Sequence, residues 1–286
     1  MNMEISKYDT INKPTWCPGC GNFGIWVALK MALSQLNIDT YQTSIVFDIG
    51  CNGNGSNFIK CYGFHGLHGR ALPIASGLKL ANNKNKVIIM GGDGGTLGIG
   101  AAHFIHSCRR NIDTTLIIHD NQVYGLTTGQ TSPTSEKGYK SKSTPLGVLE
   151  DSINPILLAL AAKCGFVAQG FSGQMNHLVD LFKSGINYKG FSLVNVFQPC
   201  VTYNHVNTFE FFQKRAYKLD LSNYDYTNYS LALEKSREWG DKIPLGIIYN
   251  VERETYEDGL SYINYDKLLN LDKAENNIEE LLNEMR

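Results

Sequence analysis

Residues 87–100 read Val-Ile-Ile-Met-Gly-Gly-Asp-Gly-Gly-Thr-Leu-Gly-Ile-Gly, and this stretch decides the fold of the chain. An apolar run typical of a buried strand leads directly into a glycine cluster with one acid, Asp93, and a predicted helix follows. Glycines at such a turn let the backbone approach a ligand closely, and the first turn of the helix directs free N–H groups at it. The stretch therefore predicts an α/β fold with an anion-binding site after a strand.

Asp93 indicates the kind of anion. A bare carboxylate would repel a diphosphate, but Mg²⁺ between them removes the conflict, because Mg²⁺ is usually held by one or two carboxylates and phosphate oxygens. A Walker A loop would end in Gly-Lys-Ser or Gly-Lys-Thr, which is absent, and the spacing of Gly92, Gly94 and Gly98 misses the dinucleotide pattern by one residue. The remaining alternative is a glycine-rich turn that only packs a strand on a helix.

The next predicted strand, residues 114–120, makes that alternative weaker. It ends at Asn121 and Val123, and the carboxyl ends of parallel strands meet at the edge where such folds bind ligands. The side-chain oxygen of Asn121 and the backbone carbonyl of Val123 would complete a Mg²⁺ shell with Asp93.

Length and composition limit the classes of function. The chain has 286 residues, 43% of them hydrophobic and 19% charged, and its formal net charge is −1. This charge gives no electrostatic reason to expect binding to nucleic acid or to an anionic membrane. No apolar run has the length of a membrane span, and the first residues lack the apolar core of a signal peptide, so the prediction is a cytoplasmic protein.

The order of predicted elements is that of an α/β domain over residues 1–206, a parallel sheet with helices on both faces. Residues 127–154 form a long polar connection, which is typical of a lid, a binding loop or a partner contact. From 207 to 286 the pattern becomes a mixed C-terminal extension with an added strand at 244–249. The elements expected besides these are helices at 22–36, 71–80, 95–108, 154–163, 174–185 and 266–286, strands at 44–50, 166–171 and 191–197, and a mobile loop at 52–57.

Four of the seven cysteines, Cys17, Cys20, Cys51 and Cys200, fall at the ends of predicted elements, where three loops can converge. Cys17 and Cys20 form a Cys-Pro-Gly-Cys knuckle, which by itself fits a redox dithiol or half of a metal site. One knuckle with two distant single cysteines differs from the paired knuckles of a zinc ribbon, and four thiolates can equally hold a [4Fe–4S] cluster. The others are interpreted as small core residues: Cys61, Cys108 and Cys164.

A loop with two histidines, His65 and His68, and Arg70 precedes the predicted helix at 71–80. Such residues at a helix start suit an anionic ligand, although a histidine there is as often a structural hydrogen-bond partner.

With these segments in view, the sequence resembles the β subunits of 2-oxoacid:ferredoxin oxidoreductases. The similarity runs from about Trp16 to Asn204. It is carried by five segments: Trp16–Gly24, Ile49–Cys51, Gly63–Ala71, Gly92–Gly94 together with Asn121, and Gln198–Asn204.

Position by position, the resemblance implies two metal sites and one cofactor. Cys17, Cys20, Cys51 and Cys200 would hold one [4Fe–4S] cluster, and Asp93, Asn121 and the Val123 carbonyl would hold Mg²⁺. His68 is the candidate catalytic residue. The residues expected to contact thiamine diphosphate are Ile49, Gly50, Cys51, Asn52, His65, His68, Gly94, Gly95, Gly125 and Leu126.

The activity implied is oxidative decarboxylation of a 2-oxoacid with coenzyme A, with electrons leaving through the cluster to ferredoxin. Such enzymes activate the aminopyrimidine with a glutamate on a second α/β domain. This chain has residues for one, so an α subunit is the expected obligate partner, in an (αβ)₂ assembly. The partner contact is expected in the extension, whose aromatics could otherwise pad the core: Tyr217, Tyr224, Tyr226, Tyr229 and Trp239.

The opening Trp-Cys-Pro-Gly-Cys-Gly-Asn resembles the 2-oxoglutarate and broad 2-oxoacid branch, so 2-oxoglutarate is favoured over pyruvate. The loop at 124–130 lacks a lysine that family members often carry, which bears on substrate choice. Two alternatives stand beside this interpretation. One is a zinc-stabilised binding protein without catalysis, and the other is a thiamine-dependent decarboxylase without ferredoxin coupling.

Overall fold

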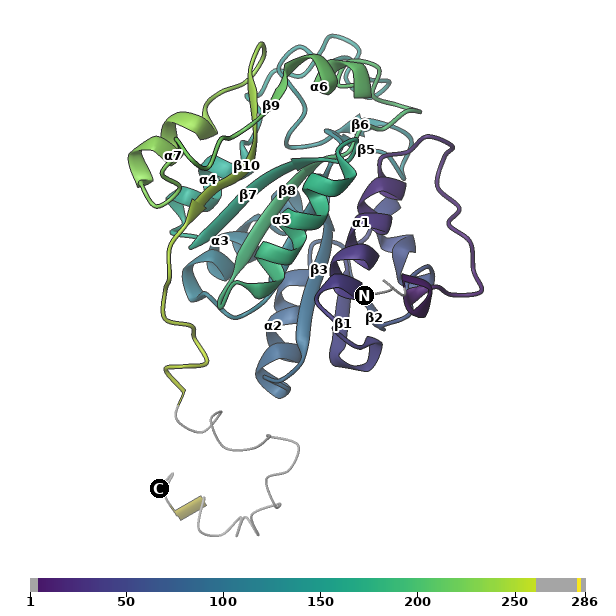
Figure 1. The fold of residues 1–286 in the computed structure, drawn as a ribbon. Helices are drawn as coiled ribbons and strands as arrows, with labels where there is room; N and C mark the ends of the chain where they lie inside the picture. The colour runs from purple at the N-terminus through teal and green to yellow at the C-terminus, as the bar shows by residue number, and fades with distance from the viewer. Residues whose placement is uncertain (1–4, 261–281, 284–286) are drawn as a thin grey trace.

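An eight-stranded sheet forms the centre of the molecule (Figure 1). The computed structural model describes residues 5–260 and 282–283, so the helix expected at 266–286 lies almost wholly outside the described residues. Neighbouring strands run parallel except for β10 against β7, which confirms the α/β class. Across the sheet the strands are β2 (Tyr62–His65), β1 (Thr43–Phe47), β3 (Lys86–Gly92), β4 (Thr115–Asp120), β8 (Ser192–Phe197), β7 (Phe166–Phe171), β10 (Ile243–Asn250) and β9 (Ala216–Lys218).

Helices cover both faces of this sheet. On one face lie α1 (Asn22–Gln35) and α5 (Met175–Asn187), which contact each other. On the other face lie α2 (Ala71–Ala81), α3 (Ala101–Arg110), α4 (Pro155–Ala161) and α7 (Tyr229–Ser236), and α6 (Phe209–Arg215) packs on an aromatic cluster next to β10. No helix in the described part of the chain is long and apolar enough to cross a membrane.

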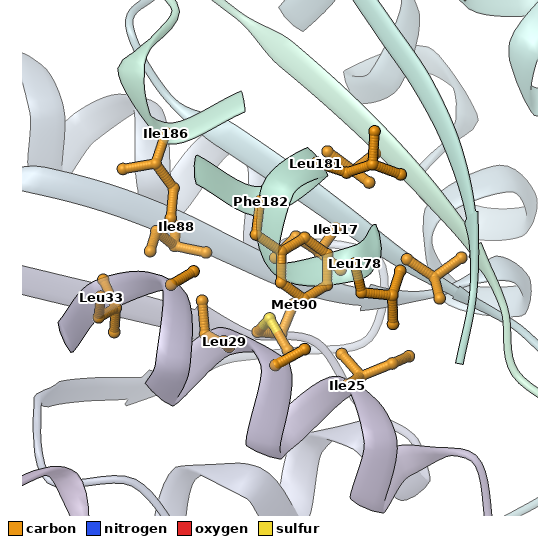
Figure 2. Packing of buried hydrophobic residues seen from close by; sticks show 14 of the residues in the cluster. Ile25, Leu29, Leu33, Ile88, Met90, Ile117, Leu178, Leu181, Phe182 and Ile186 are labelled. Atoms are coloured by element: carbon orange, nitrogen blue, oxygen red, sulfur yellow. The ribbon is translucent and has the colours of Figure 1, made fainter. Parts of the chain in front are cut away.

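The core between α1, α5 and the sheet fixes the strand that precedes the glycine cluster. Figure 2 shows Leu29 of α1 and Phe182 of α5 packing over Ile88 and Met90 of β3. Each of these side chains is at most 4% exposed, and burial of a side chain of this size contributes about 1.5–3 kcal/mol. The end of β3 is therefore held rigidly.

Strand register places the polar ends of three strands at one edge. Phe47 pairs with Met90, and Gly92 pairs with His119, so Asp48, Asp93 and Asp120 follow adjacent strands at the same level. The chain turns outward from β1 to β2 and back to β3. This reversal opens a crevice at the carboxyl ends of β1 and β3, as expected at a topological switch point.

Residues after 207 continue the same sheet. The predicted strand at 244–249 is β10, which pairs antiparallel with β7 and parallel with β9. Tyr224 is buried, and its hydroxyl donates to the carbonyl of Ile248 in β10. This aromatic side chain therefore packs within the chain. The boundary between 206 and 207 stays a prediction.

Three local elements differ from the sequence-based expectation. Residues 52–57 belong to a 3₁₀ helix, η3 (Cys51–Asn57), instead of a mobile loop. The helix expected at 95–108 is divided into a π-helix, η4 (Gly95–Ile99), and α3. The exposed edge strand β2 was not predicted, because a four-residue strand with no buried side chain shows no hydrophobic alternation.

Candidate active site

A cavity of about 170 Å³ lies at the carboxyl ends of β1, β3 and β4, and we name it the diphosphate cavity. It brings together nearly all the residues predicted to contact the cofactor or Mg²⁺. Its lining includes Ile49, Gly50, Cys51, Asn52, His68, Asp93, Gly94, Gly95, Asn121, Val123, Gly125 and Leu126. His65 is the exception, since it lies on exposed β2 beside Gly53 and does not line this cavity.

Asp93 is 1% exposed, and two hydroxyl groups hold one of its oxygens. Ser132 Oγ and Thr134 Oγ1 donate to Asp93 Oδ2 over 2.5 and 2.6 Å. Burial raises the pKa of Asp93, against the hydrogen bonds that lower it. A buried carboxylate of this kind is best stabilised by a cation, so the site fits Mg²⁺. The predicted connection at 127–154 thus supplies polar support beneath the site.

The glycines of the turn are required by close neighbours. A Cβ at Gly94 would lie 2.2 Å from a ring carbon of Tyr124, whose hydroxyl donates to the Gly94 carbonyl over 3.1 Å. A Cβ at Gly95 would lie 2.1 Å from Asp48 Oδ2. Since both contacts are shorter than any normal carbon contact, only glycine lets the backbone run this close to the cavity.

Asn121 follows β4 and is oriented by two hydrogen bonds. Its Oδ1 accepts from the backbone N–H of Val123 at 3.0 Å, and its Nδ2 donates to Gln198 Oε1 at 3.2 Å. Gln122 has a left-handed backbone, with φ of 60°, which turns the chain sharply between Asn121 and Val123. The turn gives both residues to the same cavity as Asp93, and the oxygens available there are those that Mg²⁺ prefers.

Two histidines line the diphosphate cavity. His68 Nδ1 is buried and makes no hydrogen bond with the described residues, so it is available to a ligand. Asp48 Oδ1 accepts from the N–H of Gly69 at 2.7 Å and so fixes the loop that carries His68. His119 is fully enclosed, and burial lowers its pKa to about 3. It is therefore neutral and pairs its Nδ1 with Asn22 Oδ1 at 2.7 Å.

A second cavity of about 220 Å³ is lined by Cys17, Cys20, Cys51 and Cys200, and we name it the cysteine cavity. These are the four cysteines singled out from the sequence. Within residues 5–260, no three His, Cys, Asp or Glu side chains are arranged to hold a single metal ion. The four sulfurs therefore surround a hollow, an arrangement that suits a cluster of several atoms better than one zinc ion.

The thiols of this cavity favour a cationic group. Burial raises the pKa of Cys20 to about 12 and that of Cys51 to about 11, with smaller contributions from nearby Cys200 and Cys17. Without a bound metal group the sulfurs are therefore protonated at neutral pH. Iron ligation requires thiolates, and positive iron would supply the charge that stabilises them.

The two cavities share one wall. Residues that line both are Cys51, Asn121, Gly125, Leu126 and Gln198. A Cβ at Gly125 would lie 3.5 Å from Cys51 Sγ and 3.7 Å from Cys200 Sγ, so its backbone separates the two spaces. A cofactor in one cavity and a metal cluster in the other would be in direct proximity.

Several residues of the site were not predicted. Gln198, His119 and Tyr124 line the diphosphate cavity, and Ser132 and Thr134 support Asp93. Their positions follow from the meeting of distant loops, which one sequence does not show. A partial signal was the cluster of small hydroxyl residues at 131–135 inside a connection too long for a simple link. Cys108 and Cys164 are buried in the core, as expected, and Cys61 packs partly buried against it.

Comparison with known families gives two matches. Residues 48–196 match the family described as "Thiamine pyrophosphate enzyme, C-terminal TPP binding domain". Residues 200–264 match the family that represents the C-terminal part of the beta chain of pyruvate ferredoxin oxidoreductase. The first match covers all three strands that form the diphosphate cavity except β1, which ends just before it.

Individual relatives give more detail. The chain is 45% identical over 271 residues to subunit beta of 2-oxoacid:ferredoxin oxidoreductase 1 from Aeropyrum pernix, covering 91% of this chain and 85% of that protein. It is 34% identical over 250 residues to a 2-oxoglutarate synthase subunit, KorB, from Methanocaldococcus jannaschii, covering 86% and 90%. It is also similar to a solved 2-oxoglutarate:ferredoxin oxidoreductase from Magnetococcus marinus with 2-oxoglutarate, coenzyme A and succinyl-CoA bound. There the TM-score is 0.91 and the identity 33%, over 98% of this chain and 96% of that one.

Proposed function

The chain belongs to the β subunits of 2-oxoacid:ferredoxin oxidoreductases, and on this premise we propose that it supplies the thiamine, magnesium and iron–sulfur sites for oxidation of 2-oxoglutarate. The family places the chain in an enzyme complex with an α partner and gives it a thiamine diphosphate domain. The Mg²⁺, the cluster, the substrate and the electron path are the parts that we propose. The observation that carries the proposal is the wall shared by the diphosphate and cysteine cavities.

The residues fit these groups in charge and in kind. Asp93, Asn121 and the Val123 carbonyl offer oxygens to Mg²⁺, and Gly94 and Gly95 let diphosphate oxygens approach the turn. Thiamine diphosphate, when bound, supplies the carbanion that attacks a keto carbon and allows loss of CO₂. His68 presents its unpartnered Nδ1 within the cavity, where it can hold a phosphate oxygen or exchange a proton with the reacting groups.

Electrons would leave across the shared wall. Cys51 lines both cavities, so a cluster held by the four cysteines would lie next to the cofactor. Cys17 is exposed, which gives the opposite side of the cluster access to the surface and to ferredoxin. The cluster thus has one side toward the cofactor and one side toward an external acceptor.

We propose 2-oxoglutarate as the substrate on the names of the relatives and on the Trp-Cys-Pro-Gly-Cys-Gly-Asn opening. The lining of the diphosphate cavity contains no lysine or arginine among the described residues. The distal carboxylate of 2-oxoglutarate would therefore be recognised by the α subunit, which would also supply the glutamate for the aminopyrimidine and complete the coenzyme A site.

Exposed apolar side chains near the diphosphate cavity suit such a partner. Leu126 lines the cavity and is 49% exposed, and Leu67 and Ile99 are exposed beside His68 and the π-helix. Apolar groups at this density around a cavity mouth are typical of a surface covered by another protein. The α subunit would seal the cavity here and exclude water from the reaction.

The test is anaerobic purification of the chain with its α subunit. We expect bound thiamine diphosphate, four iron atoms per β chain, and reduction of a viologen dye that depends on 2-oxoglutarate and coenzyme A. One zinc ion without iron would instead support the non-catalytic alternative. A higher kcat/KM for pyruvate than for 2-oxoglutarate would refute the substrate proposal alone.

A further inference from the structure

Gln198 connects the two cavities through its side-chain amide. It follows β8, it is 1% exposed, and its backbone N–H donates to the Asp120 carbonyl at 2.9 Å. Its Oε1 accepts from Asn121 Nδ2 at 3.2 Å, and its Nε2 donates to Cys20 Sγ at 3.3 Å. One side chain therefore bonds a candidate Mg²⁺ ligand and a candidate cluster ligand.

The orientation of this amide is determined by its neighbours. Besides Cys20, Nε2 donates to the carbonyl of Pro199 at 3.3 Å. With the amide flipped, its oxygen would face that carbonyl and its NH₂ group would face the NH₂ group of Asn121. Both contacts would be repulsive, so the amide stays as described. A Cβ at Gly21 would lie 2.9 Å from Gln198 Cγ, which shows how tightly α1 packs against this side chain.

The same bond settles the orientation of Asn121. Its Nδ2 is directed to Gln198, so Oδ1 faces the Val123 N–H and the diphosphate cavity. If the acceptor on Gln198 were lost, the Asn121 amide would be free to rotate and offer nitrogen to Mg²⁺. Mg²⁺ strongly prefers oxygen ligands.

The N–H···S bond acts on the cluster side. Cys20 Sγ receives the Gln198 Nε2–H and also the backbone N–H of Asn22. Hydrogen bonds to ligand sulfurs stabilise the additional negative charge of a reduced cluster, and they are one of the determinants of cluster potential.

We propose that Gln198 is a positioning residue with two roles: it orients Asn121 toward Mg²⁺ and raises the reduction potential of the cluster. This inference rests on the proposed function, because it requires a cluster on Cys20. It adds to that function a specific coupling between cofactor site and cluster. Loading of Mg²⁺ and diphosphate at Asn121 would be felt at Cys20 through a single amide.

The test uses the anaerobically purified complex and a potentiometric titration followed by electron paramagnetic resonance. Gln198→Met loses both bonds, and Gln198→Glu keeps an acceptor for Asn121 but removes the amide N–H donors. We expect both variants to lower the midpoint potential by about 59 mV, a tenfold change for a one-electron couple. Gln198→Met should also weaken Mg²⁺-dependent thiamine diphosphate binding, and Gln198→Glu should weaken it less.

The control is Gln169→Met. Gln169 is also buried and loses an amide donor bond, to the Pro244 carbonyl at 2.8 Å, but it lines neither cavity. Its complex should keep the wild-type potential. Wild-type potentials in both Gln198 variants with intact clusters would overturn the inference. So would loss of the cluster from both, since that would show a structural role. Absence of a cluster from the wild-type complex would overturn the proposed function itself.

Discussion

Gly95→Ala tests whether the glycine turn is required for the reason given by its geometry. The added Cβ would lie 2.1 Å from Asp48 Oδ2, so the carboxylate of Asp48 must move. That carboxylate accepts from the N–H groups of Ile49 at 2.8 Å and Gly69 at 2.7 Å. Both loops that border the diphosphate cavity therefore depend on it.

The magnitude follows from these two bonds. A hydrogen bond to a charged group contributes about 1.5–3 kcal/mol, so partial loss of both should destabilise the chain by about 3 kcal/mol. Displacement of the Ile49 and Gly69 loops should also weaken Mg²⁺–thiamine diphosphate binding, by about 100-fold if a similar free energy is lost from the bound state.

Gly77→Ala is the matched control. Gly77 lies within α2, and no atom lies within 4 Å of the position that its added Cβ would take. Glycine in a helix costs about 0.5–1 kcal/mol relative to alanine, so Gly77→Ala should stabilise the chain and leave cofactor affinity unchanged. The measurements are denaturant unfolding of the full chain and calorimetric titration of the complex. If Gly95→Ala matched wild type in both, the steric reasoning would be wrong.

Three further changes address other parts of the molecule. Ser132→Ala removes a 2.5 Å hydrogen bond to Asp93 and should weaken Mg²⁺ affinity by about tenfold or more in a metal titration. Asn154→Ala removes the cap of α4, which accepts from two backbone N–H groups, and should lower the free energy of unfolding by about 1 kcal/mol. Glu257 is buried beside Asp113, and burial raises its pKa. The folded chain therefore holds this proton more tightly than the unfolded chain, so stability should fall as pH rises from about 4.3, the unfolded value, through the raised folded pKa. In Glu257→Gln, unfolding curves at several pH values should show a smaller slope; an unchanged slope would contradict the assignment.

The sequence was sufficient for the elements that local chemistry determines. The apolar run before Asp93 and the apolar run before Asn121 are buried parallel strands, and their polar ends meet as predicted. The four cysteines at element ends line one cavity. These features depend on hydrophobic periodicity and on the common edge of parallel strands, which single residues reveal.

Features that depend on contacts between distant loops were not predictable. Nothing near Gln198 in the sequence indicates that its amide reaches both Asn121 and Cys20. The π-helix after Gly94 forms where Tyr124 and Asp48 press on the turn, and both lie far from it in sequence. His65 shows the converse, since a histidine next to a cofactor motif lies on an exposed edge strand.

The position of β8 affects how the protein is made. It lies between β4 and β7, although the ribosome completes β7 first, and the other neighbour of β7, β10, is made last. Newly synthesised β7 therefore has no partner strand, and the apolar edge of β4 stays open, until residues 192–197 emerge. At about 5–20 residues per second this interval lasts roughly a few seconds. Unpaired strand edges of this kind invite association with other chains. We therefore expect the nascent protein to depend on chaperone binding during this interval, when a stall would be most harmful.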